Sequence, residues 1–303
     1  MIYTLTYNPS IDYYVYLDDF KSGSLNRAQK ELYFLGGKGV NVSQVLQKLN
    51  IDNTALGFVG GFTGLEIESG LQKLGCKTDF VHLPAGHSRI NIKVCEHVET
   101  EINSPGPMID AISMKALYSK LDNISKDDIF ILAGSSNAQM GSDSFASLLA
   151  ALPYRDTKII VDTTGEALLN TLAYHPFMIK PNLSELSELF HEPFSSNDLD
   201  SIIDAANNLQ LKGARNVLVS LGEDGAVLIS ESGKVLTHSA PAGIVINTVG
   251  AGDSMVAGFV AGYLANGDLE DAFIMGICAG SATAFNENLA DADDILQLYH
   301  LLR

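Results

Sequence analysis

Cysteine and basic residues are scarce in this chain, and each shortage excludes a class of protein. The 303 residues include three cysteines, which lie far apart in the sequence. Such a set is typical of free thiols in a reducing cytosol, so we expect neither a disulfide framework nor a cysteine metal site. Lysine and arginine number 19 against 36 aspartate and glutamate residues, for a net charge of −17. Nucleic acids and anionic membranes are bound by basic surfaces, so we expect neither partner.

Long apolar runs, repeats and linkers are also lacking. Because a membrane-spanning helix needs about 20 apolar residues in succession, we expect no membrane segment. The opening MIYTLTYNPS has no basic region and no cleavage site, so we expect no secretory signal and a cytoplasmic location. With 46% hydrophobic and 18% charged residues, the composition predicts one large α/β domain or two small ones.

Strand and helix patterns alternate along most of the chain. From residue 114 onward, helical patterns separate short apolar runs such as 129–132 and 159–161. Uninterrupted apolar runs are typical of strands covered on both faces, and the alternation predicts a mostly parallel, doubly wound sheet. The segments 13–17, 28–35, 88–95 and 99–103 are more polar and aromatic. We expect them to form a small sheet that projects from the main body.

A glycine-rich turn at 247–253 opens a helix and ends in a carboxylate. Unpaired N–H groups of Gly250, Ala251 and Gly252, with the helix dipole behind them, favour an anion. Asp253 follows directly, where it can take a proton from an attacking hydroxyl. The pattern indicates phosphoryl transfer to an alcohol. The plain alternative is that the glycines and Asp253 only turn the chain and cap a core helix.

A second glycine turn, with Gly37, Lys38 and Asn41, opens another helix. Its backbone and its lysine suit a phosphate or sugar hydroxyls, although a turn that merely holds a lysine would look the same. It is no Walker A motif, because no serine or threonine follows the lysine. Asp12 follows the end of the first strand, where α/β sheets place ligand-binding groups. Arg89 is either an anion clamp or a solvated edge charge.

A third cluster follows the expected strand 177–180. Lys180, Asn182 and Glu185 can hold phosphate oxygens and a hydrated Mg²⁺. A helix cap by Asn182 with Glu185 in the first turn is the plain alternative. The small-residue turn at 221–225 suits a nucleotide and equally an ordinary hairpin.

Five motifs in this order resemble the ribokinase-like, phosphofructokinase-B family of sugar kinases over essentially the whole chain. They are NPSID at 8–12, GGKGVN at 36–41, KPNLSE at 180–185, LGEDG at 221–225 and NTVGAGDSMVAGF at 247–259. The last motif, together with GSATAF at 280–285, is most similar to the 1-phosphofructokinase branch, and the tagatose-6-phosphate kinase branch is a close neighbour.

The resemblance implies one domain, 1–303, built as a three-layer αβα sandwich with a mostly parallel sheet. Segments of about 12–35 and 88–104 would form a β-sheet lid over the substrate, and the lid would join two copies into a homodimer. The implied reaction is ATP-dependent phosphorylation of fructose 1-phosphate to fructose 1,6-bisphosphate by direct in-line transfer.

The resemblance also assigns roles to residues. Asp253 is the base, and the backbone of Gly250, Ala251 and Gly252 is the anion hole. The sugar-binding positions are Asp12, Gly37, Lys38 and Asn41, with Arg89 at the substrate's own phosphate. The ATP-binding positions are Lys180, Asn182, Ser220, Gly222 and Gly225, and Glu185 holds Mg²⁺ through water.

Three other functions compete with phosphorylation of fructose 1-phosphate. A tagatose-6-phosphate kinase differs only in the sugar. A catalytically silent sugar- or nucleotide-binding regulator would have little reason to keep Asp253, Lys180, Asn182 and Glu185 together. A dinucleotide oxidoreductase is the least favoured reading, because no strand is followed by G-x-G-x-x-G and Met255 stands at the third glycine position.

Overall fold

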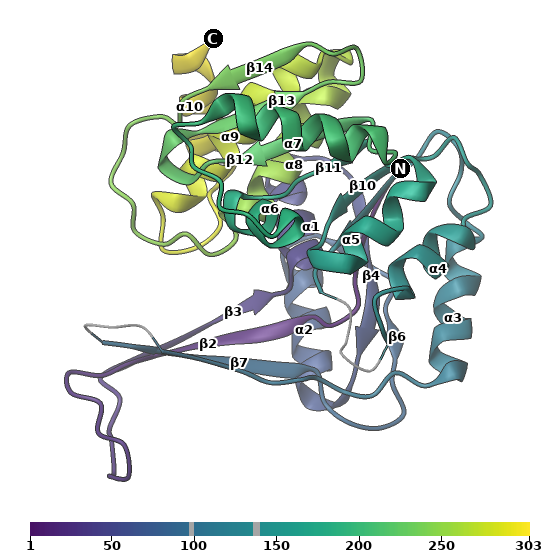
Figure 1. Ribbon diagram of the computed structural model, residues 1–303. Coiled ribbons are helices and arrows are strands. Elements are labelled where there is room, and N and C mark those ends of the chain that lie inside the picture. Colours follow the sequence, from purple (N-terminus) through teal and green to yellow (C-terminus); the bar gives the residue numbers. More distant parts are fainter. Residues whose placement is uncertain (97–99, 136–139) are drawn as a thin grey trace.

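Two separate sheets organise the protein, and Figure 1 shows the smaller one reaching away from the body. The computed structural model describes residues 1–96, 100–135 and 140–303. Of the expected strand 99–103, residue 99 lies outside the described residues. None of the described helices has the length and apolar composition that crossing a membrane requires.

The larger sheet has ten strands among the described residues, in the order β14-β13-β12-β11-β10-β9-β1-β4-β5, with β6 also paired to β4. Its strands are parallel from β12 through β5, and β13 and β14 add an antiparallel edge. The strands are β1 (Ile2–Thr6), β4 (Asn53–Val59), β5 (Lys77–Thr78), β6 (Val81–His82), β9 (Ile129–Ala133), β10 (Lys158–Asp162), β11 (Met178–Ile179), β12 (Asn216–Ser220), β13 (Ala226–Ile229) and β14 (Val235–His238). The predicted mostly parallel sheet is confirmed.

Helices cover both faces of this sheet, because its central strands are apolar on both. In β9, Phe130 and Leu132 join one core cluster while Ile129 and Ile131 join the other. One face carries α1 (Lys38–Lys48), α2 (Gly61–Lys73), α8 (Ala251–Asn266), α9 (Leu269–Ala284) and α10 (Ala292–Leu302). The other carries α3 (Ala111–Leu121), α4 (Ser144–Ala150), α5 (Gly165–Thr171), α6 (Leu183–Phe190) and α7 (Leu199–Leu211). Short 3₁₀ turns lie at η1 (Leu172–Tyr174) and η2 (Gly222–Asp224). This is the expected three-layer αβα sandwich.

The smaller sheet, called the projecting sheet below, consists of β2 (Ser10–Tyr16), β3 (Lys30–Gly36), β7 (Arg89–Cys95) and β8 (Thr100–Asn103) in the order β3-β2-β7-β8. Side chains alternate between its faces, so Asp12 and its neighbour Asn91 share one face while Tyr13 and Ile92 share the other. Asp12 therefore lies inside β2, whereas the sequence placed it in the connection after β1. The sequence missed this because the strand continues through Ile11 without a turn.

One expected strand is shorter in the structure. The strand at 177–180 is reduced to β11, because Pro181 has no N–H to extend the ladder, although Lys180 N still donates to Val161 O at 3.3 Å. After α2, the short strands β5 and β6 pair with different parts of β4.

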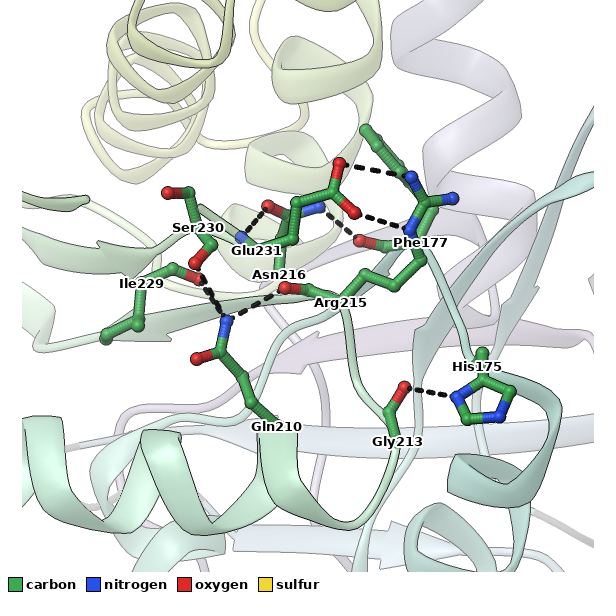
Figure 2. A network of polar contacts seen from close by, with 9 residues as sticks. All are labelled: His175, Phe177, Gln210, Gly213, Arg215, Asn216, Ile229, Ser230 and Glu231. Carbon is green, nitrogen blue, oxygen red and sulfur yellow. Dashed lines mark hydrogen bonds and ion pairs between the residues drawn. The ribbon is translucent and has the colours of Figure 1, made fainter. Parts of the chain in front are cut away.

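The amino ends of β11 and β12 are fixed by a network of polar side chains, which Figure 2 shows. The Gln210 amide donates to the carbonyls of Arg215 at 2.8 Å, Ser230 at 3.0 Å and Ile229 at 3.3 Å. The guanidinium of Arg215 binds Glu231 through Nε at 2.7 Å and Nη2 at 3.1 Å. These bonds join α7 to the start of β12 and the end of β13, at the edge opposite the carboxyl ends of the parallel strands.

Candidate active site

Predicted site residues gather, together with Asp162, at the carboxyl ends of three neighbouring strands. Asp162 ends β10, Lys180 directly follows β11 and Ser220 ends β12. The two glycine turns bring the first residues of α1 and α8 to the same edge, with Lys38 and Asp253 on them. This is the edge at which open α/β sheets bind ligands.

Asp253 is a buried carboxylate in the first turn of α8. Only 6% of it is exposed, and Oδ2 accepts a hydrogen bond from Asn41 Nδ2 at 2.8 Å. Burial, and after it the negative charge of Asp162, raises the pKa of Asp253 to about 7, although Lys38, the Asn41 bond and Lys180 lower it. A carboxylate with a pKa near neutrality is a stronger base than an ordinary carboxylate and is still partly ionised at neutral pH.

The turn before Asp253 presents backbone donors next to a cation. Gly250 caps α8 in the left-handed region with φ 79°, and no side chain caps the helix. Ala251 N donates to Thr248 O at 3.2 Å, so its N–H is already used. The N–H of Gly252 has no partner among the described residues, and a Cβ on Gly252 would lie 3.0 Å from Lys180 Nζ. The predicted anion hole therefore has fewer N–H groups to offer than expected, and Lys180 lies beside it.

Asp162 is a central residue of the site that the sequence analysis missed. It is fully buried, its Oδ1 lies 3.0 Å from Lys38 Nζ, and its Oδ2 lies 3.5 Å from Lys180 Nζ. Burial alone would raise the pKa of Asp162, but Lys180 and Lys38 together hold it below its usual range. Asp162 raises the pKa of Lys38 in turn, although burial of the ammonium acts the other way. A carboxylate at the end of an apolar strand was the available signal.

The predicted sugar side contains a cavity of about 160 Å³ with two cations in its wall. Lys38 and Arg89 both line it, and the other lining residues are Thr6, Asn8, Gly37, Gly134, Ser135 and Thr164. Arg89 Nε donates to Asn8 O at 3.1 Å, and burial lowers the pKa of its guanidinium. The structure thus places Arg89 at an enclosed anion-sized space, which favours the clamp over the solvated edge charge.

Asp12 faces the same region from the projecting sheet. Its Oδ1 accepts bonds from Ser10 Oγ at 2.9 Å and Asn91 Nδ2 at 2.8 Å, which fix the carboxylate. A Cβ on Gly36 would lie 2.2 Å from Asp12 Oδ2, so only glycine fits there. Asp12 and Asn41 line a small hollow together, and Asn41 connects it to Asp253.

The predicted nucleotide residues lie beside this cluster. Asn182 forms a parallel bridge with Ser220, and Ser220 N donates to Pro181 O at 3.1 Å. Gly225 has φ 97°, and a Cβ there would lie 2.0 Å from His238 O, so it is required by the turn itself. Gly222 has φ 66° and open space around it, as a backbone that a ligand can approach would have.

Asn182 and Glu185 form a capping box, the plain alternative that the sequence left open. Glu185 Oε2 accepts from Asn182 N at 3.0 Å, and Asn182 Oδ1 accepts from Glu185 N at 2.8 Å. The other oxygen, Oε1, lies 3.7 Å from Lys38 Nζ. Among the described residues, no group of three or more histidine, cysteine, aspartate or glutamate side chains could hold a metal ion. Glu185 alone suits a Mg²⁺ whose remaining ligands are phosphate and water.

A larger hollow, of about 610 Å³, lies at the other edge of the sheet, around the network of Figure 2. Its lining includes His175, Gln210 and Arg215 but none of the predicted site residues. Arg215 is already paired with Glu231, whereas the predicted cationic residues Lys38 and Arg89 line the smaller cavity at the carboxyl edge.

Comparison with known proteins adds independent findings. Residues 5–295 match the family described as pfkB family carbohydrate kinase. The chain is 40% identical over 298 residues to the 1-phosphofructokinase of Bacillus subtilis (strain 168), covering 98% of this chain and 97% of the relative. It is 36% identical to the D-tagatose-1-phosphate kinase of Bacillus licheniformis, covering 99% and 100%. The structure of phosphofructokinase-2 from Escherichia coli in complex with substrates and products is similar, with TM-score 0.92, 29% identity and 99% coverage of both chains.

The raised pKa of Asp253 predicts how its replacement changes stability. Because the pKa rises from 3.8 to about 7 on folding, the stability present below pH 4 is lost as the pH rises to 7. Asp253→Asn removes that loss, so its free energy of unfolding should exceed that of the wild type by up to about 4 kcal/mol at pH 8. At pH 4 the two proteins should be equal. Urea unfolding at both pH values measures this.

Asp128→Asn is the matched control for that measurement. Asp128 is also buried, but its Oδ1 binds the N-terminal ammonium at 2.6 Å, and that bond holds its pKa low despite burial. Its replacement should destabilise the protein at pH 8. Equal effects of the two substitutions, or no pH dependence for Asp253→Asn, would contradict the assignment of a raised pKa.

Proposed function

This chain belongs to the pfkB family of carbohydrate kinases, and we propose that it transfers the γ-phosphoryl group of ATP to fructose 1-phosphate, giving fructose 1,6-bisphosphate. ATP is the co-substrate that the family implies. The observation that carries the proposal is the buried Asp253 in the first turn of α8, with the cation Lys180 beside the same turn. A proton acceptor and an anion site at one helix start are what phosphoryl transfer to an alcohol requires.

The reaction proceeds in one in-line step. An oxygen of Asp253 accepts the proton of the attacking sugar hydroxyl while the hydroxyl oxygen forms its new bond to phosphorus. The bond from phosphorus to the leaving ADP oxygen breaks in the same step. The free N–H of Gly252 and the ammonium of Lys180 balance the negative charge on the phosphoryl in transit. Asn41 holds Asp253 in place throughout.

The sugar phosphate binds on the Asp12 side. Asp12, Asn41 and the backbone of Gly37 bind its hydroxyls, and Arg89 with Lys38 binds the phosphate that it already carries. The cavity with both cations supports this placement. Closure of the projecting sheet as a lid over the sugar excludes water.

ATP binds on the β11–β12 side. Lys180, Asn182 and Ser220 contact its phosphates, and Gly222 and Gly225 let the backbone approach the nucleotide. Glu185 holds Mg²⁺ through water, and the ion neutralises charge on the phosphates when it is bound. The reaction takes place in the cytoplasm, where the three cysteines remain free thiols, as they are in this structure.

Tagatose phosphates are the competing substrates, since a similar relative acts on D-tagatose 1-phosphate and the sequence also resembles the tagatose-6-phosphate kinase branch. Fructose and tagatose differ at one hydroxyl centre. The higher identity to a 1-phosphofructokinase favours fructose 1-phosphate.

A coupled ADP-release assay tests the proposal. With ATP and Mg²⁺, kcat/KM should be highest for fructose 1-phosphate among fructose 6-phosphate, tagatose 1-phosphate, tagatose 6-phosphate and the free hexoses and pentoses. Asp253→Asn should lower kcat about 10²- to 10⁴-fold and leave ATP binding nearly unchanged, while Asp128→Asn should retain wild-type turnover. A higher kcat/KM for either tagatose phosphate would mean that this sugar phosphate, and not fructose 1-phosphate, is the substrate. If no sugar causes ADP release, the protein is a catalytically silent regulator.

We also propose that the projecting sheet joins two copies of the chain. The strand register places Tyr33, Tyr13, Ile92 and Ile102 in one row across its four strands, on the face opposite Asp12. Three of these four side chains are exposed, Tyr33, Ile92 and Ile102. An apolar row on a sheet that reaches away from the body (Figure 1) is typical of an interface between copies.

Sedimentation velocity at micromolar concentration tests the dimer. The wild type should sediment as two chains of 32.5 kDa each, and Ile92→Lys should give a single chain because it places a charge in the middle of the row. Leu211→Lys is the control, since Leu211 is 90% exposed on α7, away from the projecting sheet. A monomeric wild type, or an Ile92→Lys protein that stays dimeric, would refute the interface.

A further inference from the structure

Asp162 lies between the sugar side and the nucleotide side of the site and contacts a lysine from each. Its Oδ1 faces Lys38, from the turn that opens α1, and its Oδ2 faces Lys180, from the chain after β11. Lys38 lines the cavity that contains Arg89, whereas Lys180 lies next to Gly252 at the start of α8. One carboxylate thus pairs with a cation on the sugar side and with a cation on the nucleotide side.

The surroundings make this arrangement costly unless all three charges are present. Asp162 is fully buried, and a buried carboxylate without cations is strongly destabilised. The two ammonium groups repel each other across the carboxylate. Oδ2 has no hydrogen-bond partner among the described residues, and Lys180 reaches it only as an ion pair at 3.5 Å. The position of Lys180 therefore depends on charge and not on a directed bond.

We propose that Asp162 is a positioning residue of the kinase: it holds Lys38 and Lys180 together so that both cations face the group transferred beside Asp253. This inference rests on the proposed function. Asp162 itself touches neither substrate. It acts through the two lysines: each pairs with one of its oxygens, and each serves a different ligand.

The same geometry predicts an effect on Asp253. The charged groups that act on Asp253 are Asp162 from β10, Lys38 from α1 and Lys180 from the chain after β11, and its hydrogen-bond partner Asn41 is neutral. Removal of the Asp162 charge leaves only Asp253 and, at 3.7 Å from Lys38, Glu185 to balance the two cations. The base then becomes weaker, and the low-pH limb of the rate profile moves to lower pH.

Asp162→Asn tests the proposal, because asparagine keeps the shape and loses the charge. With the sugar phosphate that the wild type turns over fastest, kcat should fall about 10²-fold or more. The acid limb of kcat/KM should move down by about one pH unit. Asp128→Asn, which removes a buried, ion-paired carboxylate at the opposite sheet edge, should change neither kcat nor the acid limb of kcat/KM. A loss of activity with an unmoved acid limb would mean that Asp162 is merely structural, and kcat within threefold of wild type would also overturn the proposal.

A second variant covers the case in which Asp162→Asn does not fold, as judged by circular dichroism. The double variant Lys38→Met with Asp162→Asn removes one charge of each sign and leaves no added net charge in the site. Its acid limb should still lie below that of Lys38→Met alone, and coincident limbs would overturn the proposal. Failure of the proposed function is seen separately, as a wild type that does not phosphorylate fructose 1-phosphate. The acid limbs are then compared on whichever acceptor it does use.

Discussion

The ion pairs of buried Asp162 with Lys38 and Lys180 hold together a site that four separate segments build. Each partner compensates the others: the lysines keep the carboxylate ionised, and the carboxylate allows two ammonium groups to lie close together. The field of this cluster acts on Asp253, whose pKa reflects burial, then Asp162, and then the opposing lysines. The reactivity of one base thus depends on charges from three other elements.

Glycine makes this close arrangement possible. A Cβ on Gly39 would lie 2.5 Å from Thr6 Oγ1, and one on Gly36 would lie 2.2 Å from Asp12 Oδ2. A side chain at Gly39 would push α1 away from β1, and one at Gly36 would collide with Asp12 inside the projecting sheet. The glycine turns therefore set the distance between Asp12, on the projecting sheet, and the helices that carry Lys38 and Asp253. An acidic protein with net charge −17 in this way concentrates a few cations where anions bind.

Apolar runs, polar strands and glycine turns are local signals, and they predicted the doubly wound sheet and the separate sheet, whereas the three-layer sandwich was implied by the family resemblance. The sequence also predicted Lys180, Asn182 and Asp253 as candidates, since each follows a recognisable turn. Asp162 escaped because its meaning lies in partners far along the chain, with Lys38 124 residues away. The bond from Asn41 to Asp253 spans 212 residues and is equally invisible in sequence. The capping box of Glu185 shows that a local pattern can also be ambiguous, since the same residues are expected at a helix start and at a metal site.

The central claim is that Asp253 accepts the proton of the attacking hydroxyl in an environment that raises its pKa. The pH dependence of kcat/KM for the wild type, measured from pH 5 to 9 with fructose 1-phosphate and saturating ATP, tests it most directly. The account predicts a limb of unit slope that rises with pH and bends near pH 7, in line with the raised pKa of Asp253. A rate that is constant down to pH 5 would contradict it, because the base would then have the pKa of an ordinary, solvated carboxylate.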